Sequence, residues 1–301
     1  MTALRTPDEH FASLPDFPYA PHYLEDLMGF EGLRLHFVDE GPPSDPVALC
    51  LHGQPTWSYL YRRMIPPLIA AGYRVIAPDF FGFGRSDKPV DEDVYTFAFH
   101  RETLRALIER LDLERILLVC QDWGGILGLT LPMDMPHRFE RLLVMNTVIA
   151  AGDFDIGDGF RAWRAYNANN PDLAVGRLIA RACPHLTPGE IAAYDAPFPD
   201  TNYKAGVRRF PELVPDRLEA PGADVSRRAR EWWRNEWSGD AFMAIGMQDP
   251  VIPPPAMRAL ARIIRGCPAP FELAEAGHFV QEWGDSVARA ALDAYADDPR
   301  A

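Results

Sequence analysis

Short runs of mostly apolar residues alternate with amphipathic helical segments through much of the chain, and this alternation is the strongest constraint on the fold. The runs are 47–51, 74–79, 116–122, 141–146 and 242–246 (VALCL, RVIAPD, ILLVCQD, RLLVMN and FMAIG). Strands buried on both faces of a parallel sheet have this composition, and helices between them make the crossovers. Residues 104–111 place aliphatic side chains at helical spacing, which indicates one such helix. The sequence therefore predicts an α/β fold with a mostly parallel sheet flanked by helices.

The alternation stops after residue 146 and resumes at 242. Residues 151–236 contain no convincing strand and include helical stretches such as 160–167 and 187–195. A helical block inserted between two strands of one sheet is the simplest explanation. We therefore expect a core of residues 1–150 and 237–301 and a helical cap of residues 151–236. Near the start of the core, residues 33–38 alternate apolar with polar side chains, which predicts a half-buried strand.

Charge and cysteine content argue against several classes of partner. Lys and Arg number 30 against 43 Asp and Glu, a net charge of -13, and no basic run points to nucleic acid or an anionic membrane. We find neither a secretory signal nor an apolar stretch of about 18 residues that would span a membrane. The four cysteines form no CxxC pair and are too few for a disulfide scaffold. We expect a monomer in the cytoplasm.

The segment around Asp122 has the pattern of a strand, a sharp turn and a helix. Cys120 lies two residues before Asp122 and Gly124 two residues after it, followed by Gly125. Small neighbours at this spacing are typical of a nucleophile elbow, a strained turn that holds its central side chain above the sheet. Asp122 could instead cap the helix that follows, which is a common role for aspartate. The usual centre of such an elbow is serine, so the carboxylate excludes a serine esterase at this elbow.

A carboxylate at the elbow predicts chemistry different from that of a hydroxyl. An aspartate is ordinarily ionised at neutral pH, so it needs no base to activate it. It suits displacement of a good leaving group from an sp³ carbon, or opening of a strained ring, and its attack leaves an ester on the enzyme. Water must then cleave that ester, which requires a general base, an orienting acid and donors for the oxyanion.

Candidates for these parts follow in the chain order expected of such an elbow. Asp249 lies just past the run 242–246, and His278 lies in AGHF after a further strand-like run. We expect His278 to take a proton from water, and Asp249 to orient its imidazole and stabilise the protonated form. The backbone N–H groups of Trp123 and Gln54 are the candidate oxyanion donors. Gln54 follows Gly53, and glycine allows a backbone to approach a substrate closely.

Several segments together resemble the haloalkane dehalogenases of the α/β-hydrolase superfamily. They are 52–62, 77–89 and 119–125 (HGQPTWSYLYR, APDFFGFGRSDKP and VCQDWGG), with GMQDP and AGHFVQE further along. The likeness spans the core, matches the cap only weakly, and is strongest to the subfamily whose catalytic acid follows the strand after the cap. It implies an α/β-hydrolase fold and hydrolysis of halogenated alkanes by water to halide and primary alcohol, through an ester on Asp122, with no cofactor and no metal.

By the same resemblance, Trp123 and Trp163 would bind the halide. Indole N–H groups donate without accepting and suit a large, weakly hydrated anion, and they stabilise the negative charge that grows as the halide leaves. Trp163 could instead pack within the cap, as we expect of other tryptophans, namely Trp232, Trp233 and Trp237.

One departure from the family concerns Gln54, which stands where close relatives carry an acidic residue. The backbone donor should be unaffected, but the field at the hydrolytic water would be less negative. For the substrate pocket, Ile126, Val251 and Ile252 are candidate lining residues.

Three alternatives remain open from the sequence. An epoxide hydrolase would use the same elbow with two cap tyrosines as acids, and Tyr166, Tyr194 and Tyr203 are available, although indoles cannot protonate an alkoxide. A fluoroacetate dehalogenase would need an arginine for the substrate carboxylate, for which Arg161 and Arg164 are candidates. A non-catalytic ligand-binding member of the fold would be expected to lack one of the catalytic residues, and here all are present.

Overall fold

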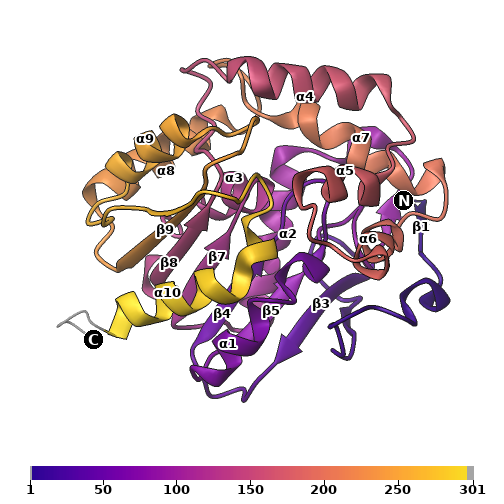
Figure 1. Cartoon of the computed structure of the whole chain (residues 1–301), viewed down its shortest axis with the longest axis horizontal. Coiled ribbons are helices and arrows are strands. Elements are labelled where there is room, and N and C mark those ends of the chain that lie inside the picture. The colour runs from indigo at the N-terminus through magenta and orange to yellow at the C-terminus, as the bar shows by residue number, and fades with distance from the viewer. Residues whose placement is uncertain (1, 297–301) are drawn as a thin grey trace.

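An eight-stranded sheet runs through the centre of the molecule (Figure 1). The computed structural model describes residues 2–296. The strand order is β10-β9-β8-β7-β4-β5-β3-β2, in which every pair from β10 to β5 is parallel and the last two pairs are antiparallel. The predicted α/β fold with a mostly parallel sheet is therefore confirmed.

Each apolar run singled out in the sequence coincides with a strand, although the last residues of the runs 74–79, 116–122 and 141–146 lie just past the strand ends. The strands are β1 (Ala3–Leu4), β2 (His22–Leu24), β3 (Leu35–Glu40), β4 (Val47–Leu51), β5 (Arg74–Pro78), β6 (Lys88–Pro89), β7 (Ile116–Cys120), β8 (Phe139–Met145), β9 (Asp240–Gly246) and β10 (Phe271–Leu273). Strands β1 and β6 form a separate antiparallel pair. All five residues of β4 and all five of β7 are buried, as expected of central strands covered on both faces.

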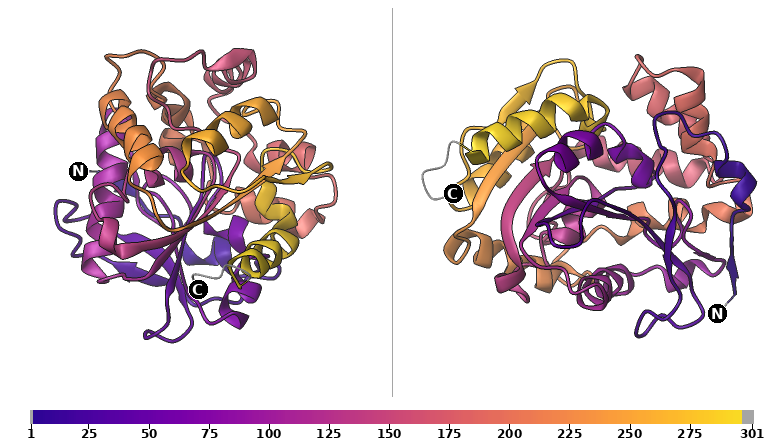
Figure 2. Two further views of the ribbon diagram at one scale, coloured as in Figure 1. Left: turned by 90° about the vertical axis from the view of Figure 1, so that its left-hand side faces the viewer. Right: turned by 90° about the horizontal axis from the view of Figure 1, so that it is seen from below.

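Helices cover both faces of the sheet (Figure 2). They are α1 (Ile65–Ala70), α2 (Phe97–Arg110), α3 (Trp123–Gly128), α4 (Gly157–Asn169), α5 (Val175–Ala182), α6 (Pro188–Asp195), α7 (Ala205–Arg209), α8 (Ala223–Asn235), α9 (Pro254–Ile263) and α10 (Gly284–Ala296). Helices α1 and α10 contact each other, as do α2 and α3. The helix indicated at 104–111 is the second half of α2.

The sequence predicts that residues 33–38 form a strand with one exposed face. A strand is present there, but the predicted exposure is wrong. The strand is β3, and His36, expected on the exposed face, is 1% exposed. Its Nδ1 lies 2.7 Å from Oδ2 of Asp79, a fully buried carboxylate that follows β5. A buried anion requires such a partner. Burial alone would raise the pKa of Asp79, but His36, His52 and the Ser58 N–H outweigh it and lower that pKa to about 2.

Between β8 and β9 the chain forms helices α4 to α8 and no strand, all within the described residues. Helix α4 lies along the top of the molecule in Figure 1, whereas α8 packs against α9 beside the sheet. The indole N–H of Trp233 in α8 donates to the Leu129 carbonyl at 2.7 Å, which ties α8 to the end of α3. The predicted division at residues 151–236 stays a prediction.

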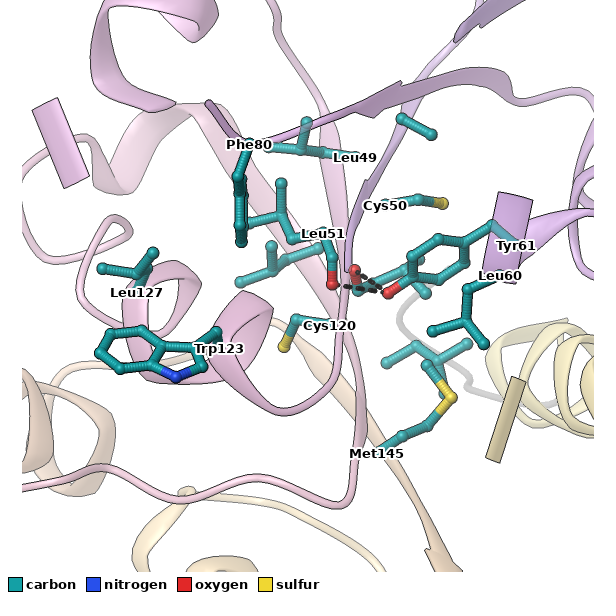
Figure 3. Close-up of a cluster of buried hydrophobic side chains, with 14 of the residues drawn as sticks. Leu49, Cys50, Leu51, Leu60, Tyr61, Phe80, Cys120, Trp123, Leu127 and Met145 are labelled. Carbon is teal, nitrogen blue, oxygen red and sulfur yellow. Dashed lines mark hydrogen bonds between the residues drawn. The ribbon is translucent and has the colours of Figure 1, made fainter. Parts of the chain in front are cut away.

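The two central strands that lead into the site loops are held together at their carboxyl ends by a tyrosine (Figure 3). Tyr61 is the last residue of the short 3₁₀ helix η2 (Ser58–Tyr61), and its hydroxyl lies 2.7 Å from the Leu51 carbonyl of β4 and 3.3 Å from the Val119 carbonyl of β7. A buried hydroxyl needs such partners, and these carbonyls lie near the carboxyl ends of the two strands. Tyr61 thereby adds a contact between β4 and β7 close to the loops that carry Gln54 and Asp122.

A buried ionic cluster joins the inserted helices to the core. The guanidinium of Arg62 donates to both carboxylate oxygens of Glu282, each at 2.7 Å, and to Glu190 of α6 at 2.8 Å. The side chains of Arg62 and Glu282 are fully buried, and Tyr194 of α6 also donates to Glu282. Arg63 contacts both glutamates from the partly exposed side. Helix α6 is therefore attached to the segment that follows His278.

We predict that Arg62→Met lowers the free energy of unfolding by about 3–5 kcal/mol, because Glu282 and Glu190 would stay buried without their partner. Denaturation in guanidinium chloride measures the loss. Arg258→Met is the matched control, since Arg258 pairs with Glu272 where both side chains are more than 40% exposed, and it should change stability little. Equal losses in the two variants would contradict a structural role for the cluster.

Candidate active site

Asp122 sits at a strained turn between β7 and α3. Its φ is 50° and its ψ -126°, a backbone conformation that non-glycine residues rarely adopt. The glycines that follow permit the turn, since a Cβ on Gly124 would lie 1.9 Å from the Leu51 carbonyl oxygen and one on Gly125 would lie 2.2 Å from Oγ1 of Thr147. The strained turn expected from the spacing of small residues is present.

The Asp122 carboxylate does not cap α3, so that alternative is wrong. Instead Oδ1 accepts a hydrogen bond of 2.8 Å from the backbone N–H of Gln54. A Cβ on Gly53 would lie 2.3 Å from the same oxygen, so glycine is required there. The Gln54 side chain extends toward α7, where its amide donates to the Val207 carbonyl at 2.9 Å. Trp123 occupies the first position of α3, where helix geometry leaves a backbone N–H without an intrahelical partner.

His278 lies between two carboxylates. Its Nε2 is 3.5 Å from Oδ2 of Asp122, and its Nδ1 is 2.7 Å from Oδ2 of Asp249. Asp249 is held by the backbone N–H groups of Val251 at 2.7 Å and Ile252 at 3.0 Å. The structure thus brings together the nucleophile, base and acid candidates from three separate loops at the carboxyl ends of β7, β9 and β10.

These charges act strongly on one another. Burial opposes ionisation of His278, but the carboxylates of Asp249 and Asp122 outweigh it and raise the pKa of the imidazole. Burial would likewise raise the pKa of Asp249, yet His278 and the two backbone N–H donors hold it below its usual value. The free site therefore favours an imidazolium between two anions.

Two supporting residues were not identified from the sequence. Asn146 directly follows β8, and its Nδ2 donates to Oδ2 of Asp249 at 2.9 Å while its Oδ1 accepts from the Gly246 N–H at 2.8 Å. Gln121 precedes the nucleophile candidate and donates to the His278 carbonyl at 3.0 Å. The available signal was a polar residue at the end of an apolar run, in ILLVCQD and in RLLVMN. Both side chains are fully buried, which is costly without such partners.

Two cavities of about 340 Å³ each reach Asp122. The first, here called the polar cavity, includes Gln54, Trp163, Arg181, Gln248, Glu275 and His278 in its lining. The second, here called the apolar cavity, includes Val148, Phe154, Phe160 and Val214 as well as the residues expected to line the pocket, Ile126, Val251 and Ile252. The nucleophile candidate is thus accessible from a charged side and from an apolar side.

The two predicted halide-binding tryptophans differ in exposure. Trp163 of α4 lines the polar cavity, whereas Trp123 is 2% exposed, packs 4.9 Å from the Phe210 ring and is not among the lining residues of either cavity. Neither indole N–H has a hydrogen-bond partner among residues 2–296, unlike those of Trp57 and Trp233, which donate to backbone carbonyls. Trp233 also packs against its neighbours Trp232 and Trp237, as expected.

The residues required by the alternative functions lie elsewhere. Neither cavity is lined by Tyr166, Tyr194 or Tyr203. Arg161 lines neither cavity and pairs with Asp155 and Asp158, and Arg164 lines neither cavity and donates to the Pro211 carbonyl and Asp216. The arginine that does line a cavity is Arg181, which sequence reasoning did not identify.

No group of three or more His, Cys, Asp or Glu side chains is placed to hold a metal ion within residues 2–296. In the same part of the chain, no helix has the length and hydropathy to cross a membrane.

The sheet and its turn define an α/β hydrolase whose elbow carries a carboxylate in place of a hydroxyl. The family model for the alpha/beta hydrolase fold matches residues 46–285. A haloalkane dehalogenase of Psychrobacter cryohalolentis is 44% identical over the full length of both chains, and one of Mycobacterium bovis is 42% identical over 94% of each. Among solved structures, the haloalkane dehalogenase DpaA of Paraglaciecola agarilytica NO2 superposes with a TM-score of 0.97 at 52% identity, covering 99% of this chain and 100% of that one.

The chain therefore belongs to the haloalkane dehalogenase family. It is a hydrolase that acts on carbon–halide bonds, with a halogenated alkane and water as substrates.

We predict that Asp122→Asn lowers the pKa of His278 in the free enzyme, because it removes one of the two negative charges that favour the imidazolium. Titration of the His278 ring by carbon-13 NMR measures the shift. Asp155→Asn is the control, since Asp155 lines the apolar cavity and pairs with Arg161, and it should leave that pKa unchanged. A pKa of His278 that is the same or higher in Asp122→Asn would refute the coupling.

Proposed function

We propose that this chain hydrolyses haloalkanes through a covalent ester on Asp122, which is cleaved by water that His278 deprotonates. The observation that carries this proposal is the position of His278, with Nε2 3.5 Å from Asp122 and Nδ1 2.7 Å from Asp249. The His278 imidazole can therefore act as a base next to an ester on Asp122, while Asp249 stabilises the positive charge of the protonated imidazole. The two cavities at Asp122 supply access for substrate and water.

In the first step, an oxygen of Asp122 attacks the halogen-bearing carbon. A carbon–oxygen bond forms as the carbon–halogen bond breaks, and the bonding electron pair leaves with the halide. The Gln54 N–H holds Oδ1 at 2.8 Å, so Oδ2 is the oxygen free to attack. The indole N–H groups of Trp123 and Trp163 would bind the halide as its charge develops, and because they do so more strongly than they bind the substrate, they accelerate the step.

In the second step, water attacks the ester carbonyl and gives its proton to His278. Esterification removes the charge of Asp122, which is one cause of the raised pKa of His278. The imidazolium therefore loses its proton more readily once the ester has formed, and the neutral ring can act as base. The negative charge that develops on Oδ1 remains with the Gln54 N–H, with the Trp123 N–H as the second donor. Asp249 stabilises the imidazolium that results.

The tetrahedral intermediate then collapses, the bond to the alkoxyl oxygen breaks as that oxygen takes the proton of the imidazolium, and the alcohol leaves. The carboxyl group of Asp122 loses its remaining proton to solvent and is again a carboxylate.

Three broader features remain proposals. We take residues 151–236 as the cap, the cytoplasm as the location and the monomer as the functional unit. The DpaA protein of Paraglaciecola agarilytica is described as tetrameric, which is a statement about that protein and the alternative to a monomer here.

We predict that Asp122→Asn abolishes bromide release from 1-bromobutane, whereas His278→Gln releases bromide once per active site and then stops. The second variant retains the nucleophile but lacks the base, so the ester accumulates. Intact-mass measurement should show the protein heavier by the butyl group, and peptide mapping should place that group on Asp122. His185→Gln, at an exposed histidine, is the control and should turn over normally. Sustained turnover by His278→Gln would refute the mechanism.

We predict that Trp163→Phe weakens bromide inhibition by at least roughly tenfold, because a hydrogen bond to an ion is worth about 1.5–3 kcal/mol. The aromatic ring is retained, so the loss reports the N–H group. Inhibition of 1-bromobutane hydrolysis by added bromide measures the effect. Trp232→Phe, a partly buried residue that packs against Trp233, should leave inhibition unchanged. An unaltered inhibition constant in Trp163→Phe would remove Trp163 from the halide site.

A further inference from the structure

The polar cavity contains a cation that the dehalogenation steps do not use. Two cavities reach Asp122, and among the described residues Arg181 is the one Lys or Arg that lines either of them. It lies in the last turn of α5, it is exposed, and no carboxylate or hydrogen-bond acceptor is bound to it among residues 2–296. Most arginines of this acidic protein pair with a carboxylate, so an unpaired one in the cavity lining is available to a ligand.

Helix α5, which carries Arg181, lies close to the reacting groups. The α5 helix ends beside the loop of the base, since a Cβ on Gly277 would lie 3.9 Å from the Ala182 carbonyl oxygen. Leu178 and Ala182 of the same helix line the cavity together with Arg181 and Trp163. A ligand that reaches Asp122 in the polar cavity would therefore share that cavity with an aliphatic surface and a guanidinium.

We propose that Arg181 forms a subsite for the carboxylate at the far end of an ω-halogenated carboxylate, so that the enzyme accepts halogenated alkyl chains with an anionic tail. The inference rests on the proposed displacement at Asp122. A planar guanidinium matches two carboxylate oxygens with two parallel hydrogen bonds, a geometry that a spherical halide ion does not use. The reaction is that of the neutral substrate, in which RBr and water give ROH, a proton and bromide, and the carboxylate takes no part in the bond changes.

Glu275 lines the same cavity and supplies an opposing charge. It is exposed, and no ion pair joins it to Arg181. If the subsite acts through charge, the two residues should have opposite effects. Removal of the Arg181 charge should weaken binding of an anionic tail, and removal of the Glu275 charge should strengthen it. A purely structural role for Arg181 at the end of α5 predicts neither pattern.

The test compares 6-bromohexanoate with 6-bromohexanol, which have the same chain length and differ in charge. In Arg181→Gln the KM for 6-bromohexanoate should rise roughly fivefold, the upper range for an exposed ion pair, while kcat and both constants for 6-bromohexanol stay unchanged. Glu275→Gln should lower the KM for 6-bromohexanoate alone. Arg177→Gln is the matched control, one turn earlier on α5, exposed and outside the cavity lining, and it should have no effect.

Chain length and salt provide further readouts. If the subsite lies apart from Asp122 as proposed, hydrolysis of bromoacetate, whose carboxylate is directly attached to the reacting carbon, should not depend on Arg181, and the dependence should appear as the chain lengthens. Sodium sulfate should reduce the advantage of the wild type over Arg181→Gln, because salt screens an exposed pair.

The outcomes separate the subsite from the mechanism. If 6-bromohexanol is hydrolysed but 6-bromohexanoate is not, or if Arg181→Gln changes both substrates equally or neither, the subsite is refuted while hydrolysis at Asp122 stands. If neither substrate releases bromide, the proposed function fails and the subsite fails with it.

Discussion

The backbone of Asp122 is held at a positive φ, and this turn sets how the carboxylate meets the other groups of the site. A strained residue costs about 1–3 kcal/mol and persists only where its surroundings fix it. Here the Asp122 N–H donates to the Asn146 carbonyl at 2.9 Å and Oγ1 of Thr147 donates to the Asp122 carbonyl at 2.7 Å, so the end of β8 holds both sides of the turn. The carboxylate is thereby directed at the Gln54 N–H and His278. Glycine at 53, 124 and 125 follows from the same geometry, because a side chain at any of them would meet the elbow or its supports.

The sequence was informative wherever a local pattern determines a local structure. Buried runs identified the central strands, small residues around Asp122 identified the elbow, and the loops after β9 and β10 supplied Asp249 and His278. It was uninformative where a contact joins distant segments. Asn146 and Asp249 are 103 residues apart, and nothing near either one reveals the hydrogen bond. The alternating pattern of residues 33–38 predicts that His36 is exposed. Instead His36 is buried, because it pairs with the buried carboxylate of Asp79, 43 residues further along the chain. Arg181 belongs to the helical segment between β8 and β9, where the sequence has no recognisable motif.

In the proposed mechanism, the charge at the site changes with each step. Before attack, the imidazole lies between two carboxylates, which favours its protonated form. Ester formation would remove one negative charge from Asp122 and transfer it to the departing halide. The remaining anion, Asp249, is neutralised by His278 and by backbone N–H groups, so it can stay buried and ionised throughout. The Arg62 cluster joins α6 to the segment just after His278, so this helix and the proposed base are linked by one buried set of contacts.

The source of the product oxygen tests the covalent ester most directly. With enzyme in excess over 1-bromobutane in water enriched in oxygen-18, a single turnover through the ester predicts an unlabelled alcohol, because its oxygen comes from the Asp122 carboxylate. The label should appear instead in the Asp122 carboxylate, where mass spectrometry of the peptide locates it. A labelled alcohol with an unlabelled Asp122 would show that water displaces the halide directly, and it would contradict the account given for this elbow.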